Sequence, residues 1–222
     1  MNITKSFLVL TCFAFLSFNA HAQQDIEEVM VTGSYIKGSA TDGASPVEVI
    51  DREEIENIGA VSIADITRNL SVNSGSENAS DSFTQGSTQG TSNVNLRGLG
   101  LSSTLILIDG RRQTLTGATA NDGSAFVNTN AIPVVALERV EVLKEGAAST
   151  YGSDAIAGVV NLILRKDFDG FELSVGSQQV SDGNQDDNTF GCSWGAGNDT
   201  THVTVAANYL DRSPSSSGDR PS

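Results

Sequence analysis

Residues 137–164 read LERVEVLKEGAASTYGSDAIAGVVNLIL. Glu138 to Leu143 alternates charged and apolar residues, which predicts a β-strand. Gly158 to Leu164 is a nearly continuous apolar run that ends before Arg165-Lys166-Asp167, and it predicts a second strand. Between these two runs, Ala147 to Tyr151 has the composition of one turn of helix. Two strands separated by a short helix indicate a domain that mixes sheet and helix.

The same mixture continues towards the N-terminus. The apolar run Thr104 to Ile108 is closed by Asp109-Gly110, which predicts a buried strand followed by a turn. Two helix starts precede it, because Asp51 is followed by Glu54, and Ser62 by Asp65, at the spacing of a capping box. The buried faces of these helices are predicted to be Ile55 and Ile58, and Ile63, Ile66 and Leu70. We therefore predict an α+β domain over residues 46–167, with a mixed β-sheet and short flanking helices.

Two long polar segments interrupt this domain. Residues 71–93 and 113–130 are rich in Ser, Asn, Gly and Thr and show no apolar periodicity. Long loops on a compact domain are frequent binding elements. The side chains that we predict to face a ligand are Phe83, Asn121, Asp122 and Phe126.

The N-terminus has the pattern of an export signal. Lys5 supplies a positive charge, Phe7 to Phe18 is almost entirely apolar, and Ala20-His21-Ala22 is a small-x-small cleavage site. The apolar run is shorter than the roughly 20 residues of a membrane-spanning helix. We therefore predict a cleaved signal peptide at residues 1–22 and a flexible acidic tether at residues 23–45.

Charge and cysteine content restrict the partners and the compartment. The net charge of −14 becomes −15 once the signal is removed, because that segment contains Lys5 and no acidic residue. This charge disfavours nucleic acid, whose phosphates require a basic surface. Loss of Cys12 with the signal leaves Cys192 alone, so no internal disulfide can form. An exported chain without a disulfide is typical of the periplasm or outer membrane of a Gram-negative cell.

Beyond residue 167 the pattern changes to strict alternation. Three segments, Phe171 to Val175, Phe190 to Ala196 and Val203 to Tyr209, place apolar residues on one side and small or polar residues on the other. This pattern suits strands that face lipid outward and water inward, although a soluble β-hairpin would show it too. A long polar connection (residues 181–187) and a tight turn near Asn198 favour a transmembrane β-barrel. We therefore predict that residues 168–222 begin a barrel that three strands cannot close, so the chain looks truncated.

Several motifs, taken in order, resemble those of the TonB-dependent outer-membrane receptor family. They are EEVMVTG (residues 27–33), NLRGLG (95–100), LIDGRR (107–112), IP (132–133), ERVEVL (138–143) and YGSDAIAGVVN (151–161). The chain departs from the family at Glu145 to Ala148, where many members carry a Gly-Pro pair. The resemblance implies a plug domain inside a β-barrel, which lets a ligand through when TonB, energised by an inner-membrane complex, acts on the plug.

The resemblance also implies particular sites. Residues Glu28, Val29, Met30, Val31, Thr32 and Gly33 form the expected TonB-binding segment. Because Val29 to Thr32 is short and β-prone, it suits addition as a strand to the edge of a partner's sheet. Plug–barrel contacts are expected at Arg97, Glu138, Arg139 and Glu141. The ligand stays open among siderophore, cobalamin, haem, carbohydrate and peptide, and outer-membrane lipid is expected to contact the barrel.

Two other classes of function compete with a receptor. An enzyme is disfavoured, because His202 is the one histidine after the signal and no catalytic or metal-binding set can be assembled. Gly98-Leu99-Gly100 is no nucleotide loop, because Ser103 stands where the third glycine belongs. We therefore expect no cofactor and no metal. The second competitor is a periplasmic plug-like binding module without transport, or a non-functional receptor fragment.

Overall fold

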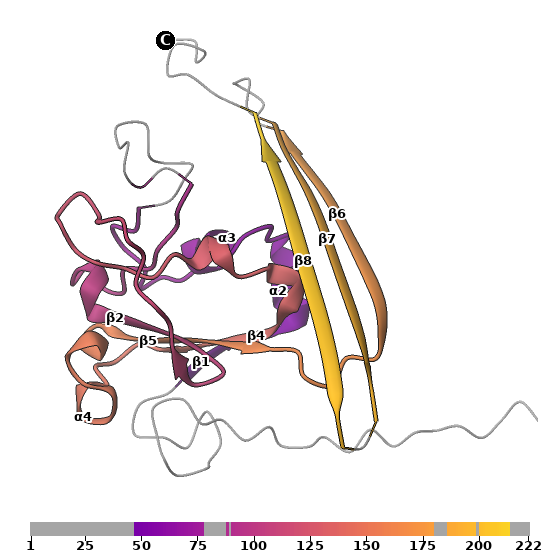
Figure 1. The fold of residues 1–222 in the computed structure, drawn as a ribbon. Helices are drawn as coiled ribbons and strands as arrows, with labels where there is room; N and C mark the ends of the chain where they lie inside the picture. The colour runs from indigo at the N-terminus through magenta and orange to yellow at the C-terminus, as the bar shows by residue number, and fades with distance from the viewer. Residues whose placement is uncertain (1–46, 78–87, 89, 180–185, 199, 214–222) are drawn as a thin grey trace, which may run out of the picture.

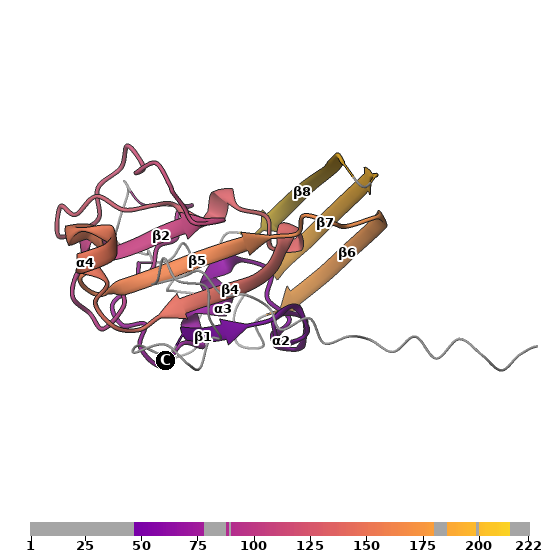
Figure 2. The same ribbon diagram turned by 90° about the horizontal axis from the view of Figure 1, so that it is seen from below.

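The computed structural model describes residues 47–77, 88, 90–179, 186–198 and 200–213. It contains a five-stranded sheet with the order β1-β4-β5-β2-β3 and a three-stranded sheet with the order β6-β7-β8. We call residues 47–167 the sheet domain and the strands β6 to β8 the wall. In Figure 1 the wall runs across one end of the five-stranded sheet, and Figure 2 shows the same arrangement from below.

The elements follow the sequence pattern closely. The strands are β1 (Val47–Ile50), β2 (Thr104–Ile108), β3 (Arg111–Arg112), β4 (Leu137–Leu143), β5 (Gly158–Leu164), β6 (Gly170–Gln179), β7 (Asp186–Gly197) and β8 (His202–Arg212). The α-helices are α2 (Arg52–Ile58), α3 (Ile63–Arg68) and α4 (Ala148–Tyr151). Short 3-10 turns are η1 (Leu101–Ser103), η2 (Thr129–Ala131), η3 (Val134–Ala136) and η4 (Ser153–Ala155). The prediction of a mixed sheet with short helices, followed by antiparallel strands, is confirmed.

Both predicted helix starts are present. The side chain of Asp51 accepts a hydrogen bond from the backbone N–H of Glu54 and caps α2, which ends at Gly59. Ser62 and Asp65 form a reciprocal capping box at the start of α3. These caps matter because helices of six or seven residues are marginal without them.

The strands of the sheet pair in both directions. β2 and β5 are parallel, whereas β1 with β4, β4 with β5 and β2 with β3 are antiparallel. Asp109 and Gly110, with φ of 49° and 75°, form the predicted turn between β2 and β3. Two positive φ values fit the two-residue hairpin turn that Asp-Gly favours.

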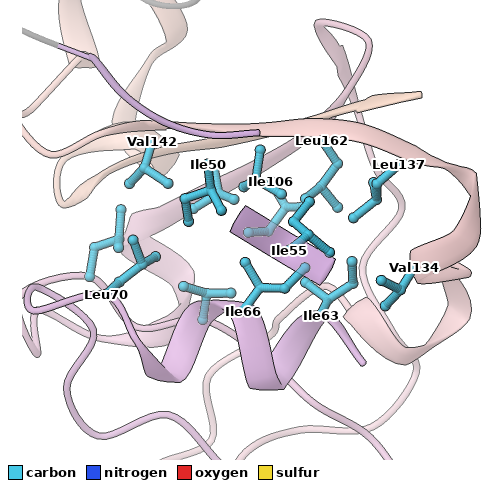
Figure 3. Packing of buried hydrophobic residues seen from close by; sticks show 14 of the residues in the cluster. Ile50, Ile55, Ile63, Ile66, Leu70, Ile106, Val134, Leu137, Val142 and Leu162 are labelled. Atoms are coloured by element: carbon cyan, nitrogen blue, oxygen red, sulfur yellow. The ribbon is translucent and has the colours of Figure 1, made fainter. Parts of the chain in front are cut away.

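The main core lies between the sheet and the helices α2 and α3. Ile55, Ile63 and Ile66 point from the helices towards Ile106 and Leu162 of the sheet (Figure 3), and all five side chains are buried. A second, smaller cluster lies on the opposite face, where Ala147, Tyr151 and Ala155, in and around α4, pack against the sheet. The sheet is therefore covered on both faces, which explains the continuous apolar run of β5.

The wall has two unlike faces, as the alternation predicted. Its outward side chains are apolar and exposed: Phe171, Leu173, Val175, Phe190, Trp194, Val203, Val205 and Tyr209. Its inward side chains include Thr189 and Ser193, which are buried on the side of the sheet domain. Within the described ranges, no helix combines the length and the apolar character needed to cross a membrane.

Candidate functional site: the seam between the sheet domain and the wall

The sheet domain meets the wall along a seam formed by α2, η3 and the inner faces of β6, β7 and β8. At η3 the packing is close, since a Cβ added to Gly191 of the wall would lie 3.6 Å from the Cβ of Val135. At α2 the packing is open, and a cavity of about 230 Å³ separates the helix from the wall. The seam therefore combines one packed contact with one hollow.

The cavity is lined mainly by small and neutral side chains. The wall contributes Ser174, Gly176, Thr189, Gly191 and Asn208, and the sheet domain contributes Arg52, Ile55, Glu56, Gly59, Ala60, Val61, Val134 and Val135. Its volume exceeds the roughly 30 Å³ that one water molecule occupies in the liquid, and hydroxyl and amide groups offer water hydrogen bonds. The hollow can therefore hold several water molecules.

Arg52, the first residue of α2, connects this helix to both sides of the seam. Its Nη2 lies 2.7 Å from Oε1 of Glu172 on β6. Its Nη1 donates to the backbone carbonyls of Val134 and Leu137, at 3.4 and 3.3 Å, and its Nε lies 2.6 Å from Glu56. The Arg52 guanidinium therefore contacts its own helix, the η3 segment and the wall.

Glu172 is the wall's half of this connection. It alternates with the outward-facing Phe171 and Leu173, so its carboxylate points towards the sheet domain. Its second oxygen lies 2.5 Å from Nη1 of Arg165, whose guanidinium also stacks 3.9 Å from the centre of the Phe168 ring. One partly buried carboxylate thus pairs with two arginines. We call Arg52, Arg165 and Glu172 the seam cluster.

Three of the four predicted plug–barrel residues have partners inside the sheet domain. Arg97, at φ of 57°, donates to the backbone carbonyls of Ile156 and Ala157. Arg139 and Glu141 form an ion pair along β4 at 2.8 Å, with Glu141 almost fully buried. Glu138 is exposed. Contacts of these four residues with a barrel stay predictions.

The predicted ligand-facing residues separate into two groups. Asn121 and Asp122 are exposed at the tip of the 113–130 loop, and the backbone N–H of Asn121 donates to Glu77. Phe126 is 2% exposed and packs with Leu101 and Ala120. Its predicted ligand-facing position is wrong in this structure, because burial of the aromatic ring stabilises the loop from within. Phe83 lies outside the described residues.

The predicted TonB-binding segment, Glu28 to Gly33, also lies outside the described residues, as do the signal peptide and the tether. In the described part of the chain, no three His, Cys, Asp or Glu side chains are grouped so that they could hold a metal ion.

None of the three residues of the seam cluster was among the predicted site residues. The sequence does contain one indication of this cluster. Glu172 is the one charged residue in the alternating segment 171–175, and it occupies the inward side. A charge at that position needs a partner, since a buried carboxylate is unfavourable unless it is paired. The partners, Arg52 and Arg165, lie 120 and 7 residues away, and only the fold brings them together.

Comparison with known proteins identifies the sheet domain. The family model for the TonB-dependent Receptor Plug Domain matches residues 39–159. Similar solved structures include the siderophore receptor PirA from Acinetobacter baumannii, with 29% identity and a TM-score of 0.52, covering 74% of this chain and 24% of that one.

A mutant of the ferric enterobactin receptor PfeA from Pseudomonas aeruginosa, in complex with enterobactin, has 25% identity and a TM-score of 0.56. That match covers 79% of this chain and 26% of the receptor. The FpvAI–pyocin S2 complex, at 19% identity and a TM-score of 0.58, shows likeness of fold. This chain spans about a quarter of the length of these solved chains.

Proposed function

We propose, because this chain belongs to the family of TonB-dependent receptors, that its sheet domain is the plug of an outer-membrane receptor for active uptake of a ligand. The plug blocks the barrel that the wall begins, and TonB drives its movement. The observation that carries the proposal is the plug-family match over residues 39–159, in a chain whose next three strands have an apolar outer face. Such a face suits contact with outer-membrane lipid.

The outer face of the wall also favours a receptor over a soluble periplasmic module or a non-functional fragment. Phe171 and Val175 are 67% and 73% exposed, and Trp194 and Tyr209 are exposed beside them. A contiguous apolar patch of this kind is unfavourable in water. Cell fractionation tests the point: a receptor is recovered in the outer membrane, and recovery in the soluble periplasm contradicts the proposal.

TonB is the proposed energising partner, through residues 28–33. A β-prone segment that adds to a sheet edge binds by backbone hydrogen bonds, and proline removes one donor and fixes φ. We expect Val29→Pro to weaken binding of the isolated C-terminal domain of TonB to the purified full-length receptor by roughly tenfold or more. Thr41→Pro, in the tether but outside this segment, should leave the affinity unchanged. Equal affinities of wild type and Val29→Pro would contradict the assignment.

For the ligand, the solved relatives support a siderophore first, because two of them are described as siderophore or ferric enterobactin receptors. Cobalamin, haem, carbohydrate and peptide are the other candidates. Asn121 and Asp122 are the proposed contacts in the described part of the plug, since both are exposed at the end of a long loop. Purified receptor with ferric enterobactin as the probe tests the first class by fluorescence quenching.

A further inference from the structure

The N-terminal end of the sheet domain is held at its edge. Among the described residues, β1 is an edge strand that pairs over four residues with β4. Asp51 follows β1 directly and is also the N-cap of α2. A displacement of β1 therefore also moves the start of α2. What holds α2 in place therefore decides how far a disturbance of the N-terminus extends.

Beside the wall, α2 is not held by close packing. The cavity of about 230 Å³ lies between the helix and the inner faces of the wall strands. Elsewhere on the inner face, Ser193 and Thr204 carry hydroxyls with no hydrogen-bond partner among the described residues, although Ser193 is 1% exposed. Buried hydroxyls are normally paired, so this seam lacks the complementarity of a permanent interior.

The ion pair between Arg52 and Glu172 crosses the seam at this hollow. The Arg52 side chain is 23% exposed, the Glu172 side chain 30% and the Arg165 side chain 15%. Such partly buried ion pairs are directional and reversible, and water replaces them more readily than it replaces an apolar core. Arg165 keeps Glu172 oriented when Arg52 leaves, because its bond to the second carboxylate oxygen does not involve α2.

From this arrangement we propose that the seam cluster is a latch: Arg52 closes α2 onto the wall, and its release from Glu172 opens the cavity as a passage for small hydrated solutes. The inference rests on the proposed receptor function and adds to it the place at which the plug first opens, which is the seam beside α2. The lining fits a small neutral solute, because Ser174, Thr189 and Asn208 offer hydroxyl and amide groups beside apolar side chains such as Val61 and Val134. Arg52 and Glu56 are the charged side chains on its α2 side.

The test uses the purified full-length receptor in liposomes, with entry of arabinose followed by the rate of swelling and with no TonB present. We expect Glu172→Gln to raise the rate roughly fivefold over wild type, because loss of one partly buried ion pair shifts the closed–open equilibrium by that order. The control is Asp154→Asn, which removes the carboxylate of a similarly short but more exposed ion pair, Arg112–Asp154 at 2.6 Å, away from the seam. Its rate should equal that of wild type.

Arg52→Gln provides a second route to the same state. It should raise the rate as Glu172→Gln does, and the double variant should add little, because the Arg52–Glu172 ion pair across the seam is already lost in each single variant. A Glu172→Gln rate equal to wild type overturns the latch, as does an equal rise in Asp154→Asn, which would show general loosening. If the Glu172→Gln variant does not insert into liposomes, the swelling rate of Arg52→Gln alone decides whether the latch exists.

Separate measurements can refute the latch and the receptor function. Binding of the C-terminal domain of TonB to the wild-type receptor tests the function without involving the seam. Intact TonB binding together with unchanged swelling of Glu172→Gln and Arg52→Gln overturns the latch and leaves the receptor assignment in place.

Discussion

At the scale of single residues, Gly158 is the most constrained position of the sheet. It opens β5 at φ of 141°, and an added Cβ would lie 2.4 Å from the carbonyl oxygen of Leu143 and 2.7 Å from Cδ1 of Leu96. Backbone and core therefore both exclude a side chain. We expect Gly158→Ala to lower the free energy of unfolding of the sheet domain by about 2–3 kcal/mol, measured by denaturant unfolding of the purified protein.

Gly117→Ala is the matched control for this substitution. Gly117 has no positive φ, and nothing lies within 4 Å of its added Cβ. The change should stay within about 0.5 kcal/mol of wild type. Equal unfolding midpoints for Gly158→Ala and Gly117→Ala would refute the steric argument.

Asp122 gives a prediction that depends on pH. Hydrogen bonds from the backbone N–H of Ser124, at 2.8 Å, and then from the Ser124 hydroxyl lower the pKa of its carboxyl below the ordinary 3.8. The charged form stabilises the tip of the 113–130 loop. This contribution is present above the ordinary pKa and is lost as the pH falls through the lowered value.

An NMR titration of the Asp122 carboxyl checks this, with an expected midpoint below 3.8. Ser124→Ala keeps the backbone donor and loses the hydroxyl, so its midpoint should lie between the wild-type midpoint and the ordinary value. A wild-type midpoint at or above the ordinary value would show that the turn does not form in solution.

At the scale of elements, the local sequence pattern was sufficient to predict most of the helices and strands. The capping residues of α2 and α3 act within three residues of each other, so the sequence contains the whole motif. The wall strands were also predictable, because alternation follows directly from strand geometry. Each wall strand extends beyond its predicted apolar segment, since polar residues such as Ser177 and Asn188 continue the pairing.

Contacts between distant elements were not predictable in this way. No local pattern specifies that β2 lies parallel to β5 or that Arg52 meets Glu172 across 120 residues. Phe126 was assigned to the ligand because its loop is polar, whereas the small core formed by Leu101 and Ala120 takes up the ring. Side-chain direction in a loop depends on tertiary packing, which periodicity does not describe.

The outward face of the wall supports a prediction about membrane insertion. Leu173 lies in the middle of the apolar band, between the rows of Phe171 and Val175 on its own strand. An arginine there would face hydrocarbon, so we expect Leu173→Arg to destabilise the folded receptor by about 2–4 kcal/mol. Urea unfolding in phospholipid vesicles measures the loss.

Ser177→Arg is the control for position along the strand. Ser177 shares the outward side of β6 with Leu173 but pairs with the polar Asn188, beyond the apolar band. Its effect should be about 0–1 kcal/mol, as at the membrane interface. If both arginines destabilise equally, the apolar face does not contact lipid.

For the whole molecule, the sheet domain should differ in local stability from its edge to its centre. In the described sheet β1 is paired on one side only, whereas β5 is paired on both sides and is largely buried. Amides that open together exchange with water at a rate set by their local free energy of opening. We expect hydrogen exchange at β1 to be roughly tenfold or more faster than at β5, measured by mass spectrometry of the full-length receptor.

Equal exchange at β1 and β5 would mean that the sheet opens only as one unit. Faster exchange at β5 than at β1 would contradict the strand order, in which β5 is central and β1 lies at the edge of the described sheet.

The short connection between the two sheets limits how far the plug can travel. Only residues 165–169 join the end of β5 to the start of β6. Fully extended, five residues reach about 17 Å. β5, at the centre of its sheet, is therefore connected to the wall by a short stretch of chain, whereas β1 lies at the edge of the described sheet. In the proposed receptor, we therefore expect a pull on the N-terminus to separate the sheet domain from its β1 side first, while β5 stays attached to the wall.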